Sequence, residues 1–127
     1  MINRLKVVYF NATSGEDPKI TTINDDLQEF YRLLNCRAIN IVNRIICDVP
    51  VCVICDDEGL LKENPTLSAI FYPELARAFV GNLIITGPYD LEGNLTSLSE
   101  QDAKRVLLAQ AKVNGKLALL FDSYKRG

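Results

Sequence analysis

The sequence predicts a single α+β domain spanning residues 1–127, with a mixed, mostly antiparallel sheet and about three helices packed mainly on one face. Short apolar segments rich in β-branched residues alternate with segments whose apolar residues recur at helical spacing. Turn-forming residues separate successive strand segments by a few positions, which favours hairpins. The expected order, β-β-α-β-β-α-β-α-β, is not regular enough for a doubly wound parallel sheet.

The first third of the chain predicts a hairpin followed by a helix. Residues 7–10 and 19–23 are strand segments, and residues 11–18 between them are dense in turn formers. Asp25 is the expected N-cap of the helix, with Gln28 as its reciprocal partner. The apolar stripe of this helix falls at i, i+3, i+4 and i+7, at Leu27, Phe30, Tyr31 and Leu34.

The middle of the chain predicts two strands, at 39–46 and 49–55. The second is almost wholly apolar, as expected of a central strand that is covered on both faces. Residues 60–72 are expected to be irregular or to contain a short helical turn. Pro73 then suits the first position of a short helix that runs through Val80.

The last third predicts a strand at 83–85, a loop at 89–96, a helix and a final segment. Ser97-Leu98-Ser99-Glu100 has the capping-box pattern that opens a helix, and Asn114-Gly115 should end it. Residues 117–121 are expected to form a final strand or an extended tail packed on the body.

The charge balance disfavours nucleic acids as partners, and the short apolar stretches disfavour membranes. The chain has 14 basic and 16 acidic side chains and a net charge of −2. Nucleic-acid-binding proteins usually have a basic surplus, because neutralising phosphates drives their affinity. No apolar stretch approaches the roughly 20 residues that span a bilayer, and no secretory signal is recognised. We therefore expect the chain to stay in the cytoplasm.

Histidine is absent, which excludes mechanisms that need an imidazole base or ligand. The four cysteines are expected to be free thiols packed as small apolar side chains. Cys52 and Cys55 have C-x-x-C spacing, but residues three apart in a strand point to opposite faces, which disfavours a zinc site. We therefore predict no metal site and no cofactor. The other two cysteines are Cys36 and Cys47.

The candidate binding residues are an acidic turn and two tyrosines. Asp56, Asp57 and Glu58 place three carboxylates at the end of a buried strand, where they could bind magnesium or supply a general base. The alternative is a solvated turn in which these residues supply turn geometry. Tyr72 and Tyr89 are candidates for stacking on a ligand or on a partner side chain. No catalytic residue is predicted.

Five segments in order are characteristic: PKITTI at 18–23, DDLQEF at 25–30, CDDEGLL at 55–61, GNLIITG at 81–87 and SLSEQD at 97–102. Over residues 5–110 this pattern resembles the family known as domain of unknown function 3846, found in phages and mobile elements. Asn64 precedes Pro65 here, whereas such domains have the proline first, and the tail after Gly115 has no counterpart. The resemblance implies a small cytoplasmic protein of a phage or mobile element, and it implies no activity.

The leading hypothesis is a non-catalytic binding module. It would engage a host protein, an element-encoded protein or a small ligand, either to counter a host defence or to regulate the element. One alternative is a small carboxylate- and metal-dependent enzyme centred on residues 56–58. Another is a structural or assembly subunit that works as a homo-oligomer.

Overall fold

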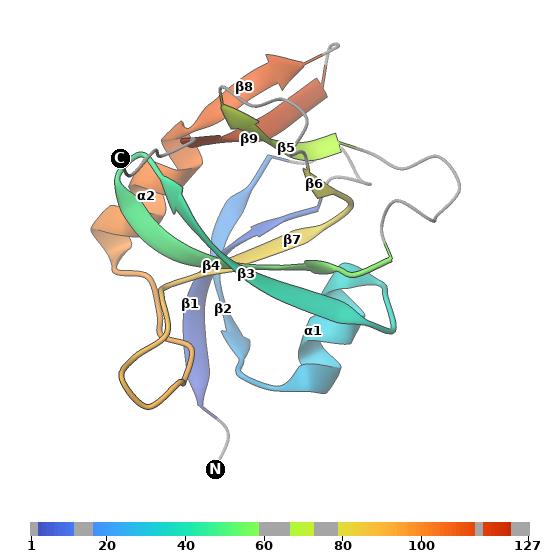
Figure 1. Cartoon of the computed structure of the whole chain (residues 1–127), viewed down its shortest axis with the longest axis vertical. Helices are drawn as coiled ribbons and strands as arrows, with labels where there is room; N and C mark the ends of the chain where they lie inside the picture. Colours follow the sequence, from blue (N-terminus) through green and yellow to red (C-terminus); the bar gives the residue numbers. More distant parts are fainter. Residues whose placement is uncertain (1–2, 12–16, 59–66, 73–78, 114–115, 123–127) are drawn as a thin grey trace.

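The computed structural model describes residues 3–11, 17–58, 67–72, 79–113 and 116–122 (Figure 1). The larger of its two sheets has five strands in the order β2-β1-β7-β4-β3, and every neighbouring pair is antiparallel. These strands are β1 (Arg4–Phe10), β2 (Lys19–Asn24), β3 (Ile39–Ile46), β4 (Val49–Asp56) and β7 (Leu83–Thr86).

Two hairpins form the sides of this sheet, and β7 lies between them. The predicted pairing of the first two strands is confirmed, with Val7 opposite Thr21. In the second hairpin, β3 and β4 are joined by Cys47 and Asp48, which have φ angles of 48° and 67°. Two successive positive φ angles are the conformation of a type I′ turn, whose twist matches that of the flanking strands.

The central strands bury side chains on both faces, as the sequence of β4 predicts. Val51 and Val53 of β4 lie in one core cluster together with Ile85 of β7. The alternate residues Ile54 and Ile84 lie in a second cluster. Because side chains alternate along a strand, the two clusters occupy opposite faces of the same sheet.

The helices α1 (Leu27–Leu34) and α2 (Glu100–Leu108) cover these opposite faces. Phe30 of α1 packs in the cluster that contains Ile54, whereas Ala103 and Val106 of α2 pack in the cluster that contains Val53. The prediction that the helices pack mainly on one face is therefore wrong. Since the central strands are apolar on both sides, each side must be covered.

The predicted first helix is confirmed, but its N-cap is Asp26 and not Asp25. The backbone amide of Asp25 instead donates to the carbonyl of Asn3 at 2.8 Å, which draws this residue toward β1. No side-chain cap forms at Asp26. Within the expected stripe, Phe30 is buried but Leu27 is 47% exposed.

A smaller sheet has four strands in the order β6-β5-β9-β8 and contacts the first sheet where β9 meets β3. Its β5–β9 pair is parallel, and its other two pairs are antiparallel. The described residues thus form a mixed, mostly antiparallel α+β structure, as predicted, and the final strand is present. The strands are β5 (Leu67–Tyr72), β6 (Phe79–Val80), β8 (Gln110–Val113) and β9 (Lys116–Asp122).

This second sheet corrects two expectations. Residues 67–72 form a strand where an irregular segment was expected, and residues 79–80 are a strand rather than a helix end. The rest of the expected third helix, at 73–78, lies outside the described residues, which contain two helices. Ala69 pairs with Leu119, 50 positions later, and local sequence patterns carry no signal for such a distant partner. The helix α2 also ends at Leu108, well before Asn114.

Candidate functional site

The most distinctive surface feature is the loop of residues 88–95, hereafter the 88–95 loop, which leaves the large sheet after β7 (Figure 1). The chain departs at Gly87 and returns at Thr96, and the amide of Gly87 donates to the carbonyl of Thr96 at 2.8 Å. A Cβ at Gly87 would lie 2.7 Å from the carbonyl oxygen of Ser97. The absence of a side chain at Gly87 therefore allows the outgoing and returning segments to lie this close together.

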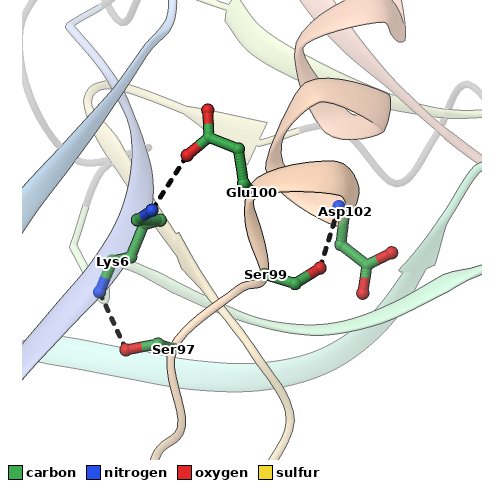
Figure 2. A network of polar contacts seen from close by, with 5 residues as sticks. All are labelled: Lys6, Ser97, Ser99, Glu100 and Asp102. Carbon is green, nitrogen blue, oxygen red and sulfur yellow. Dashed lines mark hydrogen bonds and ion pairs between the residues drawn. The ribbon is translucent and has the colours of Figure 1, made fainter.

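The returning segment is attached to β1 and to the start of α2 (Figure 2). The Lys6 amide donates to the Ser97 hydroxyl at 2.9 Å, and the Leu98 amide donates to the Lys6 carbonyl at 2.9 Å. The Lys6 ammonium pairs with Glu100 at 2.8 Å. These contacts fix the returning segment to β1 of the large sheet.

The N-cap of α2 lies two residues later than expected. Ser99 is the N-cap of α2, and its hydroxyl accepts from the Asp102 amide at 3.0 Å. Ser97, the expected cap, uses its hydroxyl for the Lys6 amide instead. The competition between a strand contact and a helix cap decides where α2 begins.

The 88–95 loop is held rigid by its own hydrogen bonds. Tyr89 and Leu95 form an isolated β-bridge. The Asp90 carboxylate accepts from the amides of Glu92 and Asn94, both at 2.9 Å. Gly93 closes the turn with a φ of 84°. The hydrogen bonds from Asn94, Glu92 and Gly93 lower the pKa of Asp90, so its carboxylate is charged at neutral pH.

This rigid loop presents apolar side chains to solvent. Leu91, at its tip, has a relative exposure of 107%, and Tyr89 is 42% exposed. Leu98, on the returning segment beyond the loop, is by contrast 3% exposed. An isolated exposed leucine is ordinary, but here a tyrosine, a residue type that is enriched among the hot spots of protein interfaces, lies beside it on the same ordered loop.

The root of the 88–95 loop lies against β4. The Cys52 thiol is buried and donates to the Asn43 side-chain oxygen at 3.3 Å. Burial raises the pKa of the Cys52 thiol, and a hydrogen bond from the Tyr89 backbone offsets part of that rise. Burial, and to a smaller extent the charge of Cys52, raises the pKa of Tyr89. Cys52 is thus a protonated packing residue beneath Tyr89 rather than a reactive thiolate.

The acidic turn lies away from the 88–95 loop. Asp56 is four residues beyond Cys52 along β4, which corresponds to about 13 Å. Its carboxylate accepts from the Glu58 amide at 2.9 Å, and Glu58 pairs with Arg37 at 3.4 Å. The Asp57 amide donates to the Ala38 carbonyl at 2.9 Å. Two of the three carboxylates are therefore engaged in local contacts with the turn and its neighbour.

The predicted separation of Cys52 and Cys55 is seen directly. Cys55 belongs to the cluster beneath α2, and Cys52 lies at the alternate position of β4, which points to the opposite face. Burial, followed by the charges of Asp57 and Asp56, raises the pKa of Cys55 to about 11. In the described part of the chain, no group of three or more acidic or cysteine side chains is placed to hold a metal ion.

Of the candidate residues, Tyr89 alone lies on the 88–95 loop. Tyr72 is in β5, where the structure describes the backbone. The described helices include none that is long and apolar enough to cross a membrane.

The model of the family described as a domain of unknown function (DUF3846) matches residues 5–111. The chain belongs to this family. Comparison with curated proteins and with solved structures finds no match.

Two of the segments that resemble the DUF3846 family have structural roles here. Gly81 has a φ of 81°, which favours glycine. The buried Asn82 side chain donates to the Leu33 carbonyl at 3.1 Å and to the Tyr9 hydroxyl at 3.4 Å. Asn82 thus ties the last turn of α1 to the large sheet. The segment at 97–102 supplies the contacts to β1 and the cap of α2.

Sequence analysis of this DUF3846 domain did not identify Leu91. The sequence feature that could have identified it is the spacing of the turn-forming residues around it, with Asp90 before it and Gly93-Asn94 after it. Such a tight turn leaves its central side chain with nothing to pack against. An apolar residue at that position is a candidate for contact with another molecule.

Proposed function

We propose that this DUF3846 domain is a non-catalytic binding module that engages a partner protein through the 88–95 loop. The observation that carries the proposal is the full exposure of Leu91 on a loop whose backbone is fixed by hydrogen bonds. Tyr89, beside it, offers a partly exposed aromatic ring.

Rigidity is what makes this loop suited to binding. A flexible loop loses conformational freedom when it docks, which costs about 0.5–1.5 kcal/mol for each side chain that is immobilised. The Asp90 hydrogen bonds and the bridge between Tyr89 and Leu95 have already ordered the backbone. More of the contact energy from Leu91 and Tyr89 then remains as affinity.

The resemblance to phage and mobile-element proteins suggests the setting. The partner would be a cytoplasmic protein of the host or one encoded by the same element. Binding would then counter a host defence or regulate the element. The engaged carboxylates of Asp56 and Glu58 support a binding role over a metal-dependent reaction at the acidic turn.

The test is affinity capture with the full chain from a lysate of the cells that encode it, comparing Leu91→Ser with Leu108→Ser. Leu108 is 84% exposed at the end of α2, so it is a matched exposed leucine on another surface. Proteins retained by the unmodified chain and by Leu108→Ser should fall at least about tenfold with Leu91→Ser, because an anchor residue contributes on the order of 2 kcal/mol. Equal capture by all three chains would show that the 88–95 loop is not the binding surface.

A further inference from the structure

Leu91 is flanked by negative charge on both sides. Asp90 and Glu92 are its direct neighbours, and both are exposed. Residues 87–99 contain no lysine or arginine. The ion pairs among the described residues join Lys6 with Glu100, Arg32 with Glu29 and Arg37 with Glu58. The charges of Asp90 and Glu92 are therefore not neutralised by an ion pair within the described chain.

We propose that the partner carries an apolar socket rimmed by lysine or arginine side chains, into which Leu91 inserts while Asp90 and Glu92 face the basic rim. This rests on the proposed function, since it names the chemistry of the partner of the same loop. A buried apolar centre with complementary charges around it is the usual arrangement of a specific interface. The hydrogen bond that the Glu92 amide donates to the Asp90 carboxylate holds both acidic residues close to the leucine.

The same charges argue against three other occupants. A second copy of this chain, docked loop to loop about a two-fold axis, would bring Asp90 and Glu92 against their own counterparts, and like charges placed together are unfavourable. Nucleic acids and anionic lipid surfaces would be repelled in the same way.

The experiment places the photoreactive amino acid p-benzoylphenylalanine at position 91 of the full chain and sequences the peptide to which it crosslinks in the lysate. We expect an apolar segment of another protein with lysine or arginine close by. A crosslink to a second copy of the chain, or to a segment without basic neighbours, would overturn the inference.

Charge reversal supplies the second readout. Glu92→Lys should lower capture of that protein about three- to tenfold at low salt, and added salt should weaken capture by the unmodified chain. Asp17→Lys, which makes the same charge change at an exposed site before β2, should leave capture unchanged.

The two proposals fail separately. If Leu91→Ser abolishes capture while Glu92→Lys and salt have no effect, the loop binds but the basic rim is refuted. If Leu91→Ser has no effect, both the proposed function and this inference are refuted.

Discussion

Replacing Gly87 by alanine should loosen the base of the 88–95 loop. The new Cβ would lie 2.7 Å from the Ser97 carbonyl oxygen and 3.0 Å from that of Thr96. Both are backbone atoms, so the returning segment itself must move. That movement would break the bond from the Gly87 amide to Thr96, which is 2.8 Å long.

The size of the effect follows from these contacts. Overpacking costs about 1–3 kcal/mol, and one lost hydrogen bond adds about 1 kcal/mol. We therefore expect Gly87→Ala to lower the free energy of unfolding by about 2–4 kcal/mol. For a chain of this length, about 4 °C of Tm corresponds to each kcal/mol, so Tm should fall by about 8–16 °C.

The assay is thermal unfolding followed by circular dichroism, with Gly93→Ala as the matched control. Gly93 has a φ of 84° and nothing within 4 Å of an added Cβ. Its substitution costs conformational strain alone, about 1 kcal/mol or about 4 °C. If Gly87→Ala melts within a few degrees of the unmodified chain, or if Gly93→Ala is the more damaging change, the steric reasoning is wrong.

Three further predictions concern the helix cap and the thiols. Ser99→Ala should cost about 1 kcal/mol, seen as a Tm lower by about 4 °C, whereas Ser99→Asp should retain the cap; equal loss in both variants would contradict a cap role. With a thiol reagent at pH 8, the exposed Cys47 should react first, and Cys55, whose pKa is about 11, should react only when the chain unfolds. Cys47→Ser should therefore remove the fast phase of the reaction. Burial holds the Cys55 pKa above its ordinary value of 9.0, so the contribution of Cys55 to stability should be intact below about pH 9 and should decline between pH 9 and about 11. Urea unfolding of Cys55→Ala should not show this decline; a parallel decline in that variant would assign the effect to other groups.

Local sequence patterns predict well those helices and hairpins that are formed by contacts between residues close together in the sequence. The β3–β4 hairpin is specified by β-branched strands around a two-residue turn, and α1 by the spacing of Phe30 and Leu34. The position of each cap is less predictable, because Ser97 and Ser99 are chemically equal. Contact with Lys6 of β1, 91 positions away, decides between them.

The second sheet and the helix placement could not be predicted from local patterns. β5 depends on a parallel partner at the other end of the described chain, in β9. The apolar character of β4 did indicate cover on both faces, which is inconsistent with helices packed mainly on one side. The face of the sheet that each helix covers follows from the strand order, which the sequence does not reveal.

The candidate site was predictable in part. Tyr89 is an evident candidate because aromatic residues are common in interfaces. Leu91 is not, since in the sequence it looks like any other leucine. Its exposure follows from the Asp90 turn, which folds the backbone back on itself and leaves the leucine outside.

The place of β7 between the two hairpins has a consequence for synthesis of the chain. Each hairpin can form as it emerges from the ribosome, because its two strands are neighbours in sequence. Until Thr86 has been made, however, β1 and β4 each lack their second neighbour, β7. Two apolar strand edges therefore stay open. The four residues of β7, Leu83–Thr86, join the two hairpins into one sheet. A nascent chain that stalls before these residues would therefore be prone to aggregation.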